Sequence, residues 1–150
     1  MQSHHAYTSM FYHLVWATKN RQPSIDSIFK KLLYEYIGKA AVSKGWHLLA
    51  VGGVDNHIHI LIQKTSRYTI SDVVRLIKSN SSKFIRDKFL LNFTWQGGYS
   101  VFTVDISSLP RIKNYILNQK EHHKQMTFEK EYVLLLNRYQ VKYDLQDLFS

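Results

Sequence analysis

Runs of apolar, β-branched and aromatic residues predict four strands along the chain. Residues 8–18 form the first run, which ends at a polar turn. Residues 46–51 and 57–63 are two more apolar runs, and the glycine-containing connection between them is typical of a β-hairpin. Residues 99–105 follow a pair of glycines and predict the fourth strand.

Other segments repeat their apolar residues at the three-to-four-residue spacing of an amphipathic helix. Gly45 ends the first of these helices, Thr69 or Ser71 caps the second, and Thr127 caps the last. The predicted helices cover residues 25–42, residues 70–85, a segment that Pro110 opens and that runs to about residue 125, and residues 128–138.

The predicted order is strand, helix, strand, strand, helix, strand, followed by two helices. This order is that of an α+β, ferredoxin-like (split βαβ) fold, in which an antiparallel sheet carries two helices on one face. We expect the opposite face of the sheet to be open. No linker-like segment or internal repeat divides the chain, so residues 1–150 are expected to form a single domain. RNA-recognition modules share this layout, so the fold alone does not select a function.

The composition is basic, with 20 Lys and Arg residues against 11 Asp and Glu residues and a net charge of +9. With 10 Tyr, 8 Phe and 3 Trp residues, such a domain is suited to bind phosphates and stack bases. An ordinary solvated basic surface explains the charge equally well. The absence of cysteine excludes a thiol nucleophile and cysteine-bound zinc and favours the cytoplasm. No apolar run approaches the ~20 residues of a membrane helix, so no membrane partner is expected.

The most specific chemical signal in the predicted strands is a His-x-His pair. Because strand side chains alternate between faces, His57 and His59 point the same way, about 6.6 Å apart, while Ile58 points to the helices. Two imidazoles on the open face suit one metal ion. A pair of surface or cross-strand histidines is the simpler interpretation of this motif alone, and a metal site needs a third ligand.

The third predicted helix offers that ligand. Tyr115, Gln119 and His122 are spaced i, i+4 and i+7 and share one helix face. Packing of the tyrosine and solvation of the amide account for the same spacing. Asp55, Asp105 and His122 are candidates for a spare ligand or for a support of the ligands, although a turn cap or a solvated side chain explains each of them too.

Taken together, the His-x-His strand and a helix reading Tyr-Ile-x-Asn-Gln-x-x-His-His resemble the HUH-type single-tyrosine transposases. These enzymes belong to small insertion sequences that move as single-stranded DNA. The resemblance covers nearly the whole chain. Its segments are residues 12–21, 54–61, 78–83, 95–99, 128–132 and 141–144.

The resemblance implies roles for individual residues. His57, His59 and Gln119 would hold one divalent cation, and Tyr115 would be the nucleophile on a C-terminal catalytic helix. The product would be a 5′-phosphotyrosyl link to single-stranded DNA and a free 3′-hydroxyl. The partners would be DNA with subterminal hairpins and a second copy of the chain, in a homodimer that shares its sites between subunits.

The expected cation is Mg²⁺, with Mn²⁺ accepted in its place. A phenol with a pKa near 10 is a weak nucleophile at neutral pH unless a cation helps the reaction. Two imidazoles and an amide favour softer metals, however, because Mg²⁺ prefers carboxylate and water oxygens.

Candidate DNA contacts lie mainly on the second predicted helix, where a polar row runs opposite its apolar stripe. An ordinary solvated helix face explains this row equally well. Trp95 and Tyr99 are suited to stack a base or simply to pack in the core. The candidate contacts are Arg75, Lys78, Ser79, Ser82 and Arg86 on that helix, and Lys19, Asn20 and Arg21 after the first strand.

The sequence thus favours a metal-dependent DNA strand transferase. One alternative is a non-catalytic module that binds single-stranded nucleic acid with the same sheet. Another is a domesticated relative that processes genomic hairpin repeats with the same chemistry.

Overall fold

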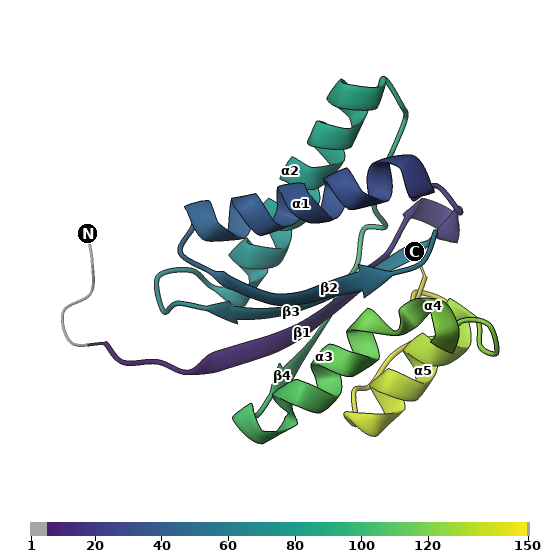
Figure 1. Cartoon of the computed structure of the whole chain (residues 1–150). Coiled ribbons are helices and arrows are strands. Elements are labelled where there is room, and N and C mark those ends of the chain that lie inside the picture. Colours follow the sequence, from purple (N-terminus) through teal and green to yellow (C-terminus); the bar gives the residue numbers. More distant parts are fainter. Residues whose placement is uncertain (1–5, 150) are drawn as a thin grey trace.

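A computed structural model of the chain describes residues 6–149 (Figure 1). Its four strands form one antiparallel sheet in the order β2-β3-β1-β4, which confirms the predicted α+β, split βαβ fold. The strand that begins the fold therefore lies in the middle of the sheet. The strands are β1 (Met10–Ala17), β2 (His47–Gly53), β3 (His57–Lys64) and β4 (Ser100–Val104).

Helices α1 (Ser27–Ser43) and α2 (Ile70–Phe89) cover one face of the sheet, as expected (Figure 1). Ile58 and Ile60 of β3 point into this layer and belong to the main hydrophobic core. The side chain of Thr69 accepts a hydrogen bond from the backbone N–H of Asp72, so Thr69 is the residue that caps α2.

The expectation of an open second face is wrong, because C-terminal helices cover it (Figure 1). Val15 and Phe102 place apolar side chains on this face, and Phe128 and Leu136 of α5 pack against them. Burying this apolar surface stabilises the third layer. The covering elements are α3 (Leu109–Leu117), α4 (Gln119–His122) and α5 (Phe128–Arg138), and two short 3₁₀ turns, η1 (Lys19–Arg21) and η2 (Ile106–Ser108), complete the fold.

The third predicted helix is interrupted where the sequence pattern indicated one continuous helix. Asn118 separates α3 from α4 with φ −102° and ψ 21°. Its amide Nδ2 donates to the carbonyl of Asn114 at 2.9 Å, so the side chain occupies an acceptor at the end of α3. The helical pattern therefore predicted the location of the segment but not its break.

Gly52 lets α3 approach the sheet closely. A Cβ atom at this position would overlap the backbone carbonyl of Ile116, which lies on α3. The two nearest atoms belong to the backbone of Ile116, so they cannot swing aside as a flexible side chain would. The absence of a side chain at Gly52 thus determines where α3 lies on β2.

We expect Gly52→Ala to lower the free energy of unfolding by about 1–3 kcal/mol, because the added methyl group forces α3 away from β2. Gly97→Ala is the matched control, since a Cβ there meets nothing within 4 Å. Urea unfolding of both variants measures the difference. Equal stability of the two variants would contradict the close packing of α3 on β2.

Candidate active site

The carboxylate of Glu131 lies at the centre of the cluster between the sheet and the C-terminal helices. This side chain comes from α5 and is almost fully buried, with 1% exposure. Its Oε1 atom lies 3.0 Å from Nε2 of His59 and 3.4 Å from Nε2 of His57. A helix from the end of the chain thus meets the predicted histidine pair on β3.

His57 and His59 share one face of β3, as the alternation of strand side chains predicted. Both are completely buried under the C-terminal helices, so their expected position on an open face is wrong. His57 lies between two amide oxygens: its Nδ1 is 2.9 Å from Oδ1 of Asn56 and its Nε2 is 2.8 Å from Oε1 of Gln119.

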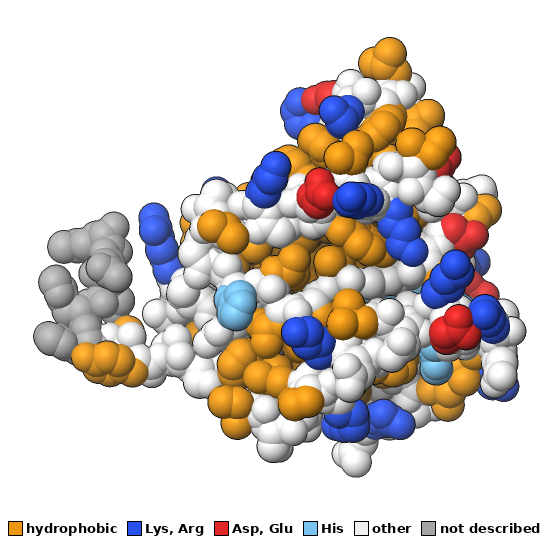
Figure 2. Space-filling view, in the orientation of Figure 1, with side chains coloured by type: hydrophobic (Ala, Val, Ile, Leu, Met, Phe, Trp, Pro, Cys, Tyr) orange, Lys and Arg blue, Asp and Glu red, His pale blue; other side chains and the backbone are white. Residues whose placement is uncertain are grey.

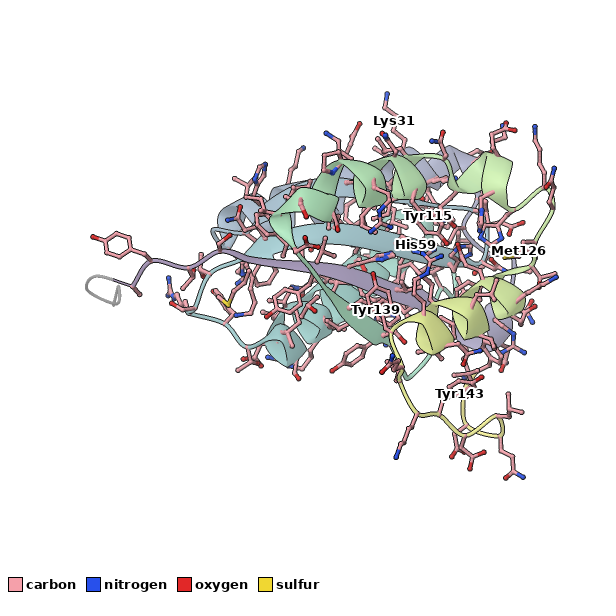
Figure 3. The ribbon with its side chains drawn as sticks, turned by 90° about the horizontal axis from the view of Figure 1, so that it is seen from below. Lys31, His59, Tyr115, Met126, Tyr139 and Tyr143 are labelled. Carbon is pink, nitrogen blue, oxygen red and sulfur yellow. The ribbon has the colours of Figure 1, made fainter. Side chains whose placement is uncertain are left out.

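The tyrosine helix reaches the same carboxylate. The hydroxyl of Tyr115 donates a hydrogen bond to Oε2 of Glu131, and Nε2 of Gln119 donates to that oxygen at 3.0 Å. His122 approaches it with its Nε2 at 3.4 Å. The three residues predicted to share a helix face therefore converge on one atom, despite the break at Asn118. Tyr115 and His59 lie in the space between α3 and α5 (Figure 3).

Three residues of the cluster were not predicted from the sequence to be site residues. They are Glu131, His13 and His123. His123 places its Nε2 3.0 Å from Oε1 of Glu131, and its Nδ1 lies 2.6 Å from the carbonyl of Met126. His13 on β1 is 1% exposed, and its Nε2 lies 2.8 Å from Nδ1 of His59.

A signal for Glu131 does exist in the sequence. It lies within the apolar stripe of α5, between Phe128 and Leu135, which are both buried. A carboxylate at a core position of an amphipathic helix needs partners, because burying an unpaired charge is costly. The polar residue in this stripe therefore indicated a buried polar site.

The cluster sets the charges of its members. Burial opposes ionisation of Glu131, but the neighbouring histidines outweigh burial and hold its pKa well below the usual range. Burial lowers the pKa of His59 to about 4. Burial, and then the charge of Glu131, raise the pKa of Tyr115 well above its usual value. At neutral pH the site therefore combines a carboxylate, a neutral imidazole at His59 and a protonated phenol.

The donor atoms are spaced as the ligands of one cation would be. His57, His59 and Glu131 each offer one ligand atom, and all three atoms lie within 4.8 Å of one another. Ligands on an octahedral ion with bonds of about 2.1 Å are separated by about 3 Å along an edge, close to the 3.0 and 3.4 Å found here. A second overlapping group consists of His122, His123 and Glu131.

The hydrogen-bond pattern of His57 also fits a cation. A neutral imidazole carries one N–H, which can be donated to Asn56. The lone pair of Nε2 then faces the lone pairs of Oε1 of Gln119 at 2.8 Å. A cation bound by both Nε2 of His57 and Oε1 of Gln119 would accept a lone pair from each atom and remove the repulsion between them.

Asp55 and Asp105 are not hydrogen-bonded to this cluster, although, against the effect of burial, the charge of Asp55 favours protonation of His123 and so helps to raise its pKa. Asp105 is exposed, and its carboxylate accepts hydrogen bonds from the hydroxyls of Ser107 and Ser108 at the start of the C-terminal region. Asp55 is exposed in the turn before β3, where its carbonyl accepts a hydrogen bond from the N–H of Ile25. Both residues therefore have the roles of turn residues in the structure, as the simpler interpretation of the sequence proposed, and not those of metal ligands.

The candidate DNA contacts of α2, with the exception of Arg86, line a hollow of about 400 Å³. Arg75 points outward beside it, with 66% of its side chain exposed. Ser82 was expected on the polar side of α2, opposite the apolar stripe, but it is buried and donates to the carbonyl of Lys78 at 2.9 Å. The hollow also includes Lys78, Ser79, Trp95 and Tyr99.

Several of these residues already hold parts of the fold together. The amine of Lys78 donates to the carbonyls of residues 96, 97 and 98. Nε1 of Trp95 donates to Ser81, which makes Trp95 a packing residue of the core. Arg86 donates to the carbonyl of Phe93, and Arg21 pairs with a glutamate of α5 at 3.2 Å.

The remaining candidates extend the basic surface. Lys19 and Asn20 are exposed in η1. On the face shown in Figure 2, Lys and Arg side chains are spread over several elements and are not confined to one patch. No helix within residues 6–149 is both long enough and apolar enough to cross a membrane.

Residues 6–119 match the family described as IS200-like transposases. The ISDra2 transposase TnpA of Deinococcus radiodurans is 23% identical over 121 residues, which cover 76% of this chain and 85% of that protein. The transposase of insertion sequence element IS200 from Salmonella typhimurium is 27% identical over 120 residues, which cover 75% of this chain and 78% of that protein.

Two solved structures are also similar. A protein of Deinococcus radiodurans R1 described as a transposase has a TM-score of 0.64 at 25% identity, and the similarity covers 79% of this chain and 97% of that one. A REP-associated tyrosine transposase bound to a REP hairpin has a TM-score of 0.62 at 16% identity, with 98% and 94% of the two chains covered. The latter establishes similarity of fold alone.

The family match spans most of the chain and contains the strand that carries His57 and His59 and the segment from Tyr115 to Gln119. Glu131 and His123 lie beyond its last residue, although both fall within the segments on which the resemblance was based. The chain belongs to the family of IS200-like transposases.

Proposed function

We propose that the protein is a metal-dependent DNA transposase that cleaves and rejoins single-stranded DNA through a 5′-phosphotyrosyl intermediate. The observation that carries this proposal is the contact of the Tyr115 hydroxyl with Glu131, beside His57 and His59. Nucleophilic attack on a phosphodiester needs the phenol as nucleophile and a divalent cation beside it. The two imidazoles and the carboxylate of this buried cluster are suitable ligands for that cation.

In the proposed cleavage step, the Tyr115 oxygen attacks phosphorus, and the bond between phosphorus and the 3′-oxygen breaks. The phenolic proton leaves along the hydrogen bond to Oε2 of Glu131 and passes on to solvent, because the low pKa of this carboxylate keeps it ionised. The departing 3′-oxygen takes a proton from solvent and becomes a hydroxyl. One phosphodiester replaces another, so a second 3′-hydroxyl can reverse the step and join a new strand without ATP.

Four side-chain atoms support binding of a divalent cation: Nε2 of His57, Nε2 of His59, Oε1 of Glu131 and Oε1 of Gln119. When bound, the cation offsets negative charge on the scissile phosphate. Glu131 supplies the carboxylate that the set predicted from sequence lacked, which reduces the conflict between two imidazoles and Mg²⁺. We therefore retain Mg²⁺ as the proposed cation, with Mn²⁺ accepted.

His13 is a positioning residue for this site. Its contact with Nδ1 of His59 fixes the imidazole so that Nε2 faces Glu131. Residues that hold a metal-ligating histidine from behind determine its orientation and tautomer.

The proposed partners are single-stranded DNA with subterminal hairpins and a second copy of the chain. A relative of the same fold is bound to a hairpin, and the hollow beside Arg75 offers a cationic surface for DNA. The proposal of a homodimer rests on family membership alone. Within one chain, Tyr115 already packs against His59, with ring centroids 5.7 Å apart. Sharing of sites between subunits would require exchange of the tyrosine helix.

Tyr115→Phe should abolish the covalent adduct that wild-type protein forms with single-stranded DNA from the flanks of its gene, in the presence of Mg²⁺ or Mn²⁺. The phenylalanine variant lacks the attacking oxygen but keeps the packing of the ring. Denaturing gel electrophoresis detects the adduct. Tyr36→Phe, on α1, is the control and should form the adduct normally. Tight binding without any adduct from the wild-type protein would favour the non-catalytic binding module.

His13→Leu should weaken Mn²⁺ binding about 10- to 100-fold, because His59 loses the group that orients it. His13→Gln should retain most of the affinity, since its terminal amide can reach the position of the imidazole Nε2. Isothermal titration calorimetry on the folded variants measures both effects. Unchanged Mn²⁺ affinity in His13→Leu would show that His13 does not position a metal ligand.

Arg75→Ala should weaken binding of a hairpin oligonucleotide and reduce the slope of log K against log salt concentration by about 1, as the loss of one phosphate contact would. Lys88→Ala, an exposed cation at the end of the same helix, is the control. Fluorescence anisotropy at several salt concentrations provides the slopes. If both variants behave alike, the hollow beside Arg75 is not the hairpin surface.

A further inference from the structure

A pocket of about 650 Å³ lies between α3 and α5 and reaches Tyr115. Its volume falls within the range of about 300–1,000 Å³ that is typical of ligand pockets. In Figure 3, Tyr115 lies between the two helices, while Met126 and Tyr139 lie near opposite ends of α5. None of the DNA contacts predicted from the sequence lines this pocket.

One part of the wall is apolar. Leu134 and Leu135 of α5 and Ile112 of α3 line it. Leu134 is 50% exposed, whereas Leu135 is 8% exposed and Ile112 is 5% exposed. Leu134 therefore supplies most of the exposed apolar surface of this wall, with Leu135 and Ile112 behind it, and a flat ring of a ligand could lie against it.

The other notable feature of the wall is a pair of arginines, Arg111 from α3 and Arg138 from α5. Both side chains are exposed, and among the described residues no carboxylate lies within ion-pair distance of either one. The charge of Arg138 also reaches the phenol, where it opposes the rise in the pKa of Tyr115 that burial and Glu131 cause. Arg111 also donates to the hydroxyl of Ser108 at 3.4 Å and lies near the charge of Asp105. An anionic ligand beside the nucleophile would therefore compete with these contacts for Arg111, whereas Arg138 is exposed to it directly.

We propose that this pocket binds the nucleotide that adjoins the scissile phosphate of single-stranded DNA. Its base lies against Leu134 and Leu135, and Arg111 and Arg138 bind its phosphates. The inference rests on the proposed function, because it assumes that Tyr115 is the nucleophile.

The position of Tyr115 in the wall supports this occupant over other ligands. Attack requires the phosphorus atom to reach the phenolic oxygen, so the nucleotide in the pocket is one of the two that flank the cleaved bond. A base offers a flat, largely apolar face, and a phosphate is well matched to the planar fork of an arginine. The pocket therefore makes cleavage depend on a base next to the cut.

The test compares rates of adduct formation on an oligonucleotide from the flanks of the gene, with and without an abasic site on each side of the mapped cleavage position. For the wild-type protein, removal of one of the two bases should slow the reaction about 10-fold, the size of a typical stacking contact. Leu134→Trp fills the apolar part of the pocket, so the variant should react slowly on intact DNA and respond little to the abasic site.

Leu117→Trp is the matched control, because Leu117 is an exposed leucine of α3 that does not line the pocket. It should respond to the abasic site as the wild type does. Arg138→Ala should slow the reaction on intact DNA and make it less sensitive to salt, whereas Lys142→Ala, outside the pocket, should not.

Two results would overturn the inference while leaving the proposed function intact. The first is normal adduct formation by Leu134→Trp with the full abasic effect, and the second is a wild-type rate that no abasic site alters. Absence of an adduct from the wild-type protein would instead contradict the proposed function. Unfolding curves of each variant verify that a slow reaction does not come from loss of structure.

Discussion

The buried carboxylate of Glu131 connects the sheet to the helix that carries the tyrosine. Four imidazoles, a phenol and an amide approach this one group. A carboxylate removed from water is costly unless opposite charges or hydrogen-bond donors compensate it. The arrangement of β3, α3 and α5 supplies those partners, so the position of Tyr115 and the charge of Glu131 depend on each other.

The rest of the fold keeps this cluster in place. Apolar packing of Phe128 and Leu136 seats α5 on the sheet, and the missing side chain of Gly52 lets α3 lie against β2. Because the site is built on strands and helices, its donors are held close to the spacing that one cation requires. The same two helices form the walls of the adjoining pocket, which connects substrate binding to the position of the nucleophile.

Periodicity predicted those parts of the site that lie within single elements. Alternation placed His57 and His59 on one face of β3, and helical spacing placed Tyr115 with Gln119, because each pattern follows from local backbone geometry. Periodicity could not predict contacts between elements that are distant in the sequence. The burial of the histidines, the contribution of His13 from β1 and the role of Glu131 all depend on how α5 docks, which no local pattern specifies. Ser82 appeared exposed on helical spacing alone, yet residues 94–99 fold over that side of α2.

The most direct test is a crystal structure of the protein grown with Mn²⁺, in which anomalous scattering locates the ion. We expect an anomalous peak at bonding distance from Nε2 of His57, Nε2 of His59 and a carboxylate oxygen of Glu131. A Mn²⁺ ion bound elsewhere, with Glu131 held only by hydrogen bonds to its histidine and tyrosine neighbours, would contradict this expectation.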